Sequence, residues 1–171
     1  SEESKTQFQK ETTFAANQME AEDMSNFGKK YALGPARVQF QNKDPKGWQE
    51  FDTQLRDHSS IGSANTKRVV QARRPSLFDL ESQLETITIP TLILNGDEDE
   101  PCLDVGLYLK RTIPSSALSL LPKTGHTCNL EEPALFNQSC EMFIHQVECG
   151  RWELRDSRSL SKGIISAEPI E

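Results

Sequence analysis

The chain has 171 residues, a length that suits one domain, and its formal net charge at pH 7 is −7. Hydrophobic residues make up 35% of it and the mean hydropathy is −0.61, so the sequence is more polar than that of an average globular domain. The acidic balance argues against a nucleic-acid or anionic-membrane partner, and no apolar run approaches the ~20 residues of a membrane-spanning helix.

The N-terminal residues predict one helix after an irregular start. Residues 1–12 are polar, and we expect them to be irregular or frayed. Apolar residues at helical spacing then predict a helix from Thr13 to Phe27, with Gly28 as its stop. We expect the apolar stripe to pack against other helices, with contact to a substrate as the alternative. The stripe comprises Phe14, Ala15, Met19, Met24 and Phe27.

A second helix is predicted after a connector that runs from Tyr31 to Gln41 and contains a Gly-Pro pair. Asp44 followed by Pro45 marks the start of this helix, because Asp caps helices and Pro suits their first position. Trp48, Phe51 and Leu55 fall on one helical face, and Ser59 to Gly62 break the helix.

Two more helices are predicted before the first strand. One runs from Ser63 to Arg73, with Val69 and Val70 facing inward and Pro75 ending it. The next is marked by Leu77, Leu80 and Leu84. Arg73 and Arg74 could bind a substrate carboxylate, although a solvated pair is the favoured interpretation.

Two short apolar runs then alternate with two helices. Ile89 to Gly96 predicts a strand, the acidic residues 97–99 follow it, and Pro101 to Ile113 predicts a helix. Ala117 to Leu121 predicts a second strand, and Pro133 to Cys149 a closing helix that ends at Gly150. Loops at the carboxyl ends of parallel strands line the ligand crevice of an open sheet, so an acid on one loop can meet a histidine on the next.

The residues after Arg151 are polar, and we expect a poorly ordered tail beyond Trp152, which could pin its beginning.

The four cysteines contain no C-x-x-C pair, so no zinc site is predicted and free thiols of a cytoplasmic enzyme are expected. Cys128 could line a pocket, but a small buried apolar side chain is favoured. His58 and His145 have no second metal ligand and are interpreted as structural.

Two motifs resemble the C-terminal half of the α/β-hydrolase family. They are Pro90-Thr91-Leu92-Ile93-Leu94-x-Gly96-x-x-Asp99 and Gly125-His126-x-x-x-x-Glu131-x-Pro133. In that family the acid lies three residues after the glycine that ends its strand, and the histidine follows a glycine after the last strand. The resemblance therefore implies Asp99 and His126 as catalytic residues, with Asp97 as the alternative acid. The order acid before histidine agrees with the family.

The chemistry explains why these residue types are needed. A neutral imidazole can take a proton from a nucleophile near pH 7, because its unperturbed pKa is about 6.5. A carboxylate on the other ring nitrogen fixes the tautomer and stabilises the imidazolium that forms.

The nucleophile of the family, a Ser in Gly-x-Ser-x-Gly, is absent, because no two of the nine glycines are four residues apart. The chain begins at Ser1, and we expect a C-terminal piece of a longer enzyme, inactive alone, whose partner is the missing N-terminal half of the same fold. The expected organisation is a helical cap or lid with a linker at 1–84, the C-terminal part of the hydrolase core at 85–150, and a polar tail at 151–171. The fold class is α/β, with the helical cap followed by the last two parallel strands and their helices.

The resemblance implies a hydrolase that acts on a small carboxylic ester or lactone, a small-molecule substrate, without a cofactor or metal. Carbon–carbon bond and epoxide hydrolases of the same fold are alternatives. Epoxide hydrolases use two cap tyrosines, whereas only Tyr31 precedes the acid here and Tyr108 follows it. A non-catalytic binding fragment is the remaining hypothesis. Two strands alone leave a long unpaired edge, so we expect the isolated chain to be molten, aggregated or oligomeric.

Overall fold

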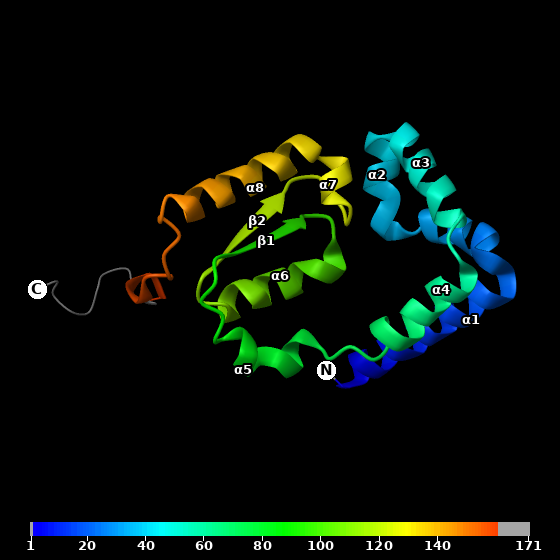
Figure 1. Ribbon diagram of the computed structural model, residues 1–171, viewed down its shortest axis with the longest axis horizontal. Coiled ribbons are helices and arrows are strands. Elements are labelled where there is room, and N and C mark those ends of the chain that lie inside the picture. The colour runs from blue at the N-terminus through cyan, green and yellow to red at the C-terminus, as the bar shows by residue number, and fades with distance from the viewer. Residues whose placement is uncertain (1, 161–171) are drawn as a thin grey trace, which may run out of the picture.

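The computed structural model describes residues 2–160. A helical part, formed by the helices within residues 2–71, lies beside an α/β part built around two strands, and the short helices within 77–84 lie next to the helix that connects the strands (Figure 1). Among the described residues, no helix combines the length and the apolar character needed to cross a membrane.

The first helix, α1 (Glu2–Ala32), is longer than predicted at both ends and is kinked at Asp23, whose backbone leaves the helical region (φ 60°, ψ 167°). The side chain of Asp23 accepts hydrogen bonds from the amides of Ser25 (2.7 Å) and Asn26 (3.2 Å), which caps the segment after the kink. The expected irregular start at residues 1–12 is wrong from Glu2 onward, because Glu, Lys and Gln favour helices even without an apolar stripe.

Gly28 does not end α1 as predicted. A Cβ at this position would lie 2.7 Å from Cγ of Arg56, so the glycine allows α1 to approach α3 (Pro45–Arg56) closely. The apolar stripe is only partly confirmed, since Phe14 is 64% exposed. The core of the helical part comprises Ala16, Met19, Met24 and Ala64, with Phe27 and Leu55 packed against it.

A helix that the sequence did not predict, α2 (Val38–Lys43), follows the 3-10 turn η1 (Pro35–Arg37), and it begins inside the expected connector and ends two residues beyond it. Phe40 of α2 is buried and meets Phe51 of α3 edge to face. The predicted start of α3 is confirmed, because the Asp44 carboxylate accepts a hydrogen bond from the amide of Gly47 (2.9 Å).

The helix predicted after α3 begins earlier than expected, and its second half is not α-helical. Ser59 caps α4 (Ser60–Asn65) by accepting a hydrogen bond from the amide of Gly62 (3.2 Å), so the expected break at 60–62 is helical. A π-helical segment, η2 (Thr66–Gln71), follows and turns the chain more widely than an α-helix does. Val69 and Val70, which lie in this segment, are 55% exposed each, and the expectation that they face inward is wrong. The fourth predicted helix is present as η3 (Leu77–Leu80) and α5 (Glu81–Leu84).

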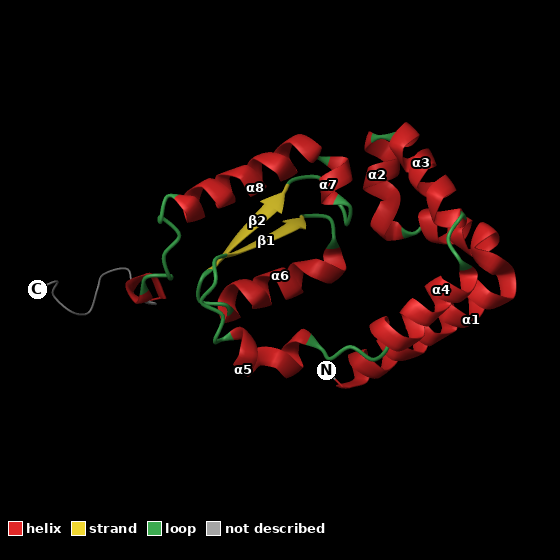
Figure 2. Ribbon diagram, viewed as in Figure 1, coloured by secondary structure: helices red, strands yellow, loops and turns green. Residues whose placement is uncertain are grey.

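The two predicted strands, β1 (Thr91–Gly96) and β2 (Ser116–Leu121), pair in parallel from Thr91 opposite Ser116 to Gly96 opposite Leu121. The crossover helix α6 (Glu100–Thr112) and the closing helix α8 (Pro133–Glu148) lie on either side of the strands (Figure 2). A short helix, α7 (Cys128–Glu131), leads from β2 into α8. Both strands therefore end at the same edge, beside α2 and α7.

Gly150 ends α8 with a positive φ of 66°, as predicted. Trp152 pins the following segment, because its indole donates a hydrogen bond to the carbonyl of Ser115 (2.6 Å) and its ring meets Phe143 edge to face. The chain beyond it is more regular than expected, with a 3-10 turn η4 (Ser157–Leu160). The rest of the predicted tail, 161–171, lies outside the described residues.

Candidate catalytic site

Two loops follow the carboxyl ends of the strands. We call residues 97–99, after β1, the acid loop, and residues 122–127, after β2, the histidine loop. They touch because β1 ends in Gly96, where a Cβ would lie 2.1 Å from the carbonyl oxygen of Thr124 and 2.3 Å from that of Gly125. Only glycine permits this approach, so the residue that identified the motif in the sequence also brings the loops together.

Three hydrogen bonds then join the acid loop to the end of β2 and to the histidine loop. The amide of Asp97 donates to the carbonyl of Leu121 (3.0 Å), and the amide of Glu98 donates to the carbonyl of Thr124 (2.9 Å). The carboxylate of Asp97 accepts from the amide of Thr124 (3.0 Å). The side chain of Asp97, the alternative acid in the sequence, is therefore engaged with the backbone of the histidine loop.

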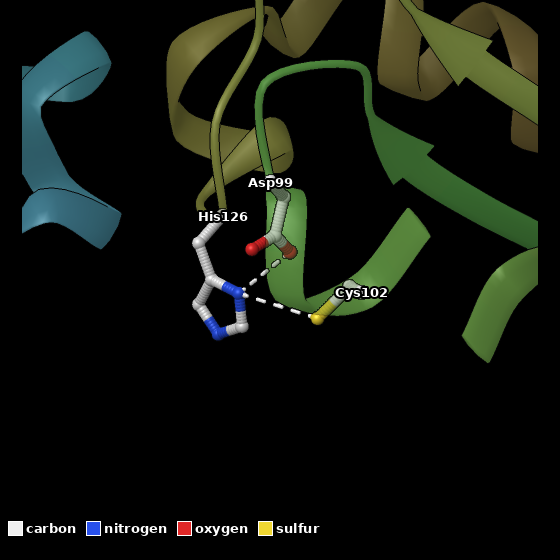
Figure 3. A group of neighbouring side chains, drawn as sticks. All are labelled: Asp99, Cys102 and His126. Carbon is white, nitrogen blue, oxygen red and sulfur yellow. Dashed lines mark hydrogen bonds and ion pairs between the residues drawn. The ribbon is translucent and has the colours of Figure 1, made fainter. Parts of the chain in front are cut away.

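Asp99 and His126 form the contact predicted from the sequence (Figure 3). Oδ2 of Asp99 lies 2.8 Å from Nδ1 of His126. Asp99 precedes α6 but makes no capping hydrogen bond with its side chain, which is free to reach the histidine. The carboxylate is 7% exposed and the imidazole 47% exposed, so the acid is shielded while the ring reaches the surface.

The second ring nitrogen, Nε2, points away from Asp99 (Figure 3), and no residue in the described part of the chain bonds to it. This is the arrangement in which a carboxylate fixes the tautomer of an imidazole and leaves the far nitrogen to move a proton. The catalytic role of Asp99 and His126 stays a prediction.

Cys102 completes a cluster that the sequence analysis did not anticipate. Its Sγ lies 3.9 Å from Nδ1 of His126, the same nitrogen that Asp99 contacts. Burial, followed by the hydrogen bond and the negative charge of Asp99, raises the pKa of the Cys102 thiol to about 11. A nucleophile needs the thiolate and the free nitrogen, so Cys102 is not suited to that role. Cys102 lies three residues after Asp99, in the first turn of α6, and this spacing was the only sign in the sequence that the two side chains could be neighbours.

The donor atoms of Asp99, Cys102 and His126 lie within 4.8 Å of one another, and these three residues could hold a metal ion. Such an ion would have to displace the hydrogen bond between Asp99 and His126, and a raised thiol pKa opposes the deprotonation that metal binding requires. The geometry thus fits an acid–histidine pair better than a metal centre.

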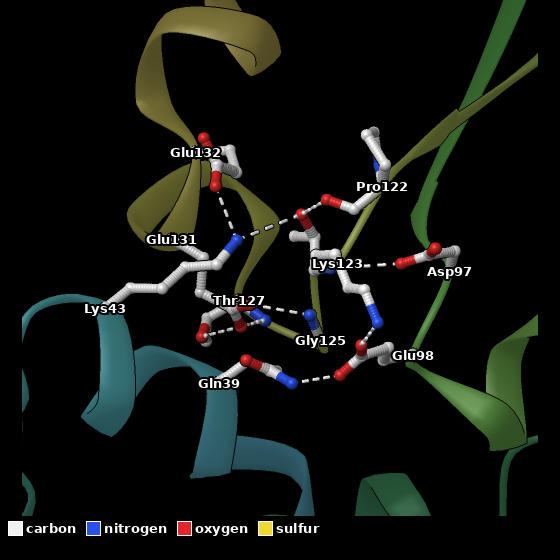
Figure 4. Close-up of polar contacts among 11 residues, drawn as sticks. Gln39, Lys43, Asp97, Glu98, Pro122, Lys123, Gly125, Thr127, Glu131 and Glu132 are labelled. Carbon is white, nitrogen blue, oxygen red and sulfur yellow. Dashed lines mark hydrogen bonds and ion pairs between the residues drawn. The ribbon is translucent and has the colours of Figure 1, made fainter.

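The helical part reaches both loops through α2 (Figure 4). The amide of Gln39 donates a hydrogen bond to the carboxylate of Glu98. Nζ of Lys43 lies 2.5 Å from the carboxylate of Glu132 and 3.5 Å from the hydroxyl of Thr124. The helix that the sequence analysis missed therefore makes the polar contacts between the helical part and the site.

Other residues considered in the sequence analysis lie elsewhere. Arg74 stands over the ring of Phe8, His58 is exposed, and His145 neighbours Cys149. Tyr31 stacks on Phe27 and lines a groove of about 350 Å³ whose other walls come from the end of α1 and from 34–37, away from both loops. Cys128 is half-buried, and burial raises the pKa of its thiol.

No family model matches the chain. A Bacillus subtilis (strain 168) protein that carries the provisional name 2-succinyl-6-hydroxy-2,4-cyclohexadiene-1-carboxylate synthase is 31% identical over 91 residues, which are 53% of this chain and 32% of that protein. The structure of MenH from S. aureus matches with a TM-score of 0.80 at 21% identity, over 86% of this chain and 55% of that one.

Two further solved structures are similar. The esterase EaEST from Exiguobacterium antarcticum matches with a TM-score of 0.64 at 22% identity, over 80% of this chain and 48% of that one. Est816, described as an N-acyl homoserine lactone degrading enzyme, matches with a TM-score of 0.52 at 25% identity, over 75% and 50% of the two chains. The chain spans about half the length of these structures and about a third of the Bacillus protein. The chain is therefore a portion of an α/β-hydrolase fold, and its structural relatives over most of its length are α/β-hydrolases.

Proposed function

We propose that this chain supplies the acid and the base of an α/β-hydrolase that acts on a small carboxylic ester or lactone. Asp99 is the acid and His126 the base in this proposal. The observation that carries it is the 2.8 Å contact between Oδ2 of Asp99 and Nδ1 of His126, with the opposite ring nitrogen pointing away. The nucleophile and the oxyanion-hole donors belong, in the proposal, to the part of the fold that this sequence does not contain.

The proposed reaction has two steps. Nε2 of His126 takes the proton of the nucleophile, which attacks the carbonyl carbon, and the same nitrogen then gives that proton to the leaving oxygen as the carbon–oxygen bond breaks. In the second step His126 takes a proton from water, the resulting hydroxide attacks the acyl group, and the nucleophile recovers its proton. Asp99 holds the tautomer and stabilises the imidazolium throughout.

The relatives support the substrate class unequally. EaEST is named as an esterase and Est816 as a lactone-degrading enzyme, and both match three quarters or more of this chain. The Bacillus protein, named as a synthase of a cyclohexadiene carboxylate, favours a second candidate, carbon–carbon bond chemistry at the same acid–histidine pair. The epoxide alternative is weakened because Tyr31 lies away from the loops.

The test uses the full-length protein and a short p-nitrophenyl ester. We expect His126→Ala to lower kcat by about 10²-fold to 10⁴-fold, the usual contribution of a general base, and His145→Ala to leave it unchanged. Equal rates for the His126→Ala variant and the wild type would overturn the proposal. Parallel assays with an N-acyl homoserine lactone and with formation of 2-succinyl-6-hydroxy-2,4-cyclohexadiene-1-carboxylate distinguish the two candidates, because the true substrate gives the higher kcat/KM.

A further inference from the structure

Glu131, the last residue of α7, is a buried carboxylate whose partners all lie in the histidine loop (Figure 4). It is 6% exposed. Oε2 accepts a hydrogen bond from the amide of Gly125 (2.5 Å). Oε1 accepts from the amide of Thr127 (3.0 Å) and from the Thr127 hydroxyl (2.8 Å). One carboxylate thus holds the residues on both sides of His126.

The chain geometry explains how Glu131 reaches that position. A single helical turn from Cys128 to Glu131 reverses the chain after the histidine loop, so a side chain five residues after His126 faces back toward it. The next residue, Glu132, turns outward instead and pairs with Lys43. Among the described residues, no cation forms an ion pair with Glu131, so the amides and the hydroxyl are what compensates its burial.

The energetics favour a stiff loop. Hydrogen bonds to a charged carboxylate are roughly twice as strong as neutral ones, and this carboxylate receives three. Thr124, at the other end of the histidine loop, is tied to the acid loop by Gly96 and Asp97 through contacts that do not involve Glu131. Loss of Glu131 would therefore release the peptide that carries the histidine ring while leaving Asp99 in place.

We propose that Glu131 is the positioning residue of His126, which clamps Gly125 and Thr127 so that Nδ1 stays on Asp99 and Nε2 stays aimed at the reacting atoms. The inference rests on the proposed function, in that His126 is taken as the base. A misplacement of about 1 Å far from the bond-making atoms can cost about 10²-fold in rate. The clamp thus acts on kcat rather than on substrate affinity.

The test variant is Glu131→Gln in the full-length protein. Glutamine has nearly the same shape, but one of its two terminal atoms is a donor that must face the N–H of Gly125 or Thr127, so at least one of the bonds breaks. We expect kcat to fall by about 10²-fold with KM unchanged. Glu132→Gln, which removes the same charge one residue away, is the matched control and should keep the wild-type kcat.

A spectroscopic readout separates positioning from general damage. We expect an Nδ1 proton that His126 donates to Asp99 to give a low-field NMR resonance, which Asp99→Asn and His126→Ala should remove. We expect Glu131→Gln to broaden or abolish this resonance at a temperature where circular dichroism shows it folded, and Glu132→Gln to keep it. Wild-type kcat and an unchanged resonance in folded Glu131→Gln would overturn the inference, while loss of activity in His126→Ala would still support the proposed function.

If Glu131→Gln does not fold, the variant Thr127→Val tests the inference instead. It removes only the hydroxyl bond and leaves both amide bonds to the carboxylate. A lower kcat with unchanged KM and a broadened Nδ1 resonance supports the clamp, and wild-type values for both overturn it. If His126→Ala is fully active, the proposed function fails, and the resonance alone still tells whether Glu131 positions the ring.

Discussion

The two loops of the α/β part and the helices that precede them are held together by different forces. The loops are joined by hydrogen bonds to buried polar groups, with Thr124 fully buried between them. The helical part has a small apolar core and ion pairs near the surface, such as Lys30 with Glu22. Buried polar bonds are costly to break and directional, whereas exposed ion pairs contribute little, so the loops should be the stiffer region.

The contact between the two regions consists of polar pairs near the surface, like those of the helical part. Lys43 and Gln39 of α2 meet side chains of the loops and of Glu132 at the surface rather than an apolar interface. Variants that compare the two regions directly test this difference.

Gly96→Ala should give the largest effect. The new Cβ would collide with two backbone carbonyls of the histidine loop, which cannot rotate away as a side chain can. Overpacking of this kind typically costs about 1–3 kcal/mol, and we expect a value at the upper end together with loss of activity. Chemical denaturation of the full-length protein measures it.

The control for that variant is Gly62→Ala in α4, where a Cβ would lie 3.4 Å from the nearest atom of Ser59. Alanine there should be neutral or stabilise the protein by about 0.5–1 kcal/mol, because glycine weakens a helix interior. Equal destabilisation by both substitutions would show that the loops are no more tightly packed than the helices.

Asp97→Ala comes next in size. It leaves the amide of Thr124 without its acceptor in a buried place, which should cost about 1–3 kcal/mol. Asp97→Asn retains an oxygen and should recover most of that loss, because the acceptor matters more than the charge. Glu22→Ala, which removes an exposed ion pair of the helical part, should cost about 0.5 kcal/mol or less in the same denaturation assay.

These contrasts also explain which parts of the molecule could be predicted from the sequence. The contact between Asp99 and His126 follows from local signals, namely a strand ended by Gly96, a second strand, and a Gly-His pair in the turn. Each of these signals fixes the backbone within a few residues. The parallel pairing of β1 and β2 followed for the same reason.

The helices could be predicted in kind but not in their bounds. The start of α1 carries no apolar stripe, and the six residues of α2 are too few to show one after Gly34-Pro35. Val69 and Val70 are exposed in a π-helical segment, and the α-helical period used for the prediction does not describe such a segment. The contacts of Cys102 and Glu131 could not be predicted, because they depend on how the loops and helices are placed in three dimensions. The division of the chain at residue 84 stays a prediction.

Cys102 offers a chemical probe of the loops. With its pKa raised to about 11, its thiol is mostly protonated at pH 8, so we expect alkylation by iodoacetamide about 10-fold slower than at the exposed Cys149. The rate should rise with pH up to that pKa. Asp99→Asn removes the charge and the acceptor that oppose the thiolate, so it should lower the pKa and speed the reaction. Mass spectrometry of the modified peptides follows both rates, and an unchanged rate in Asp99→Asn would contradict the assigned contact.

A small effect is also expected where the two regions meet. The coupling free energy between Lys43 and Glu132, from a double-mutant cycle with alanine at each position, should be about 0.2–1 kcal/mol, because both side chains are partly exposed. A coupling as large as that of the buried bonds would mean that α2 is held rigidly against the junction of α7 and α8.

The central claim is that Asp99 and His126 act as one unit, and the kcat values of Asp99→Asn, His126→Ala and the double variant test it most directly. Residues that act together are strongly non-additive, so removing the second one costs little once the first is gone. We predict that the double variant in the full-length protein is no slower than His126→Ala alone. Losses that multiply, with each substitution lowering kcat by the same factor whether or not the other is present, would contradict the account.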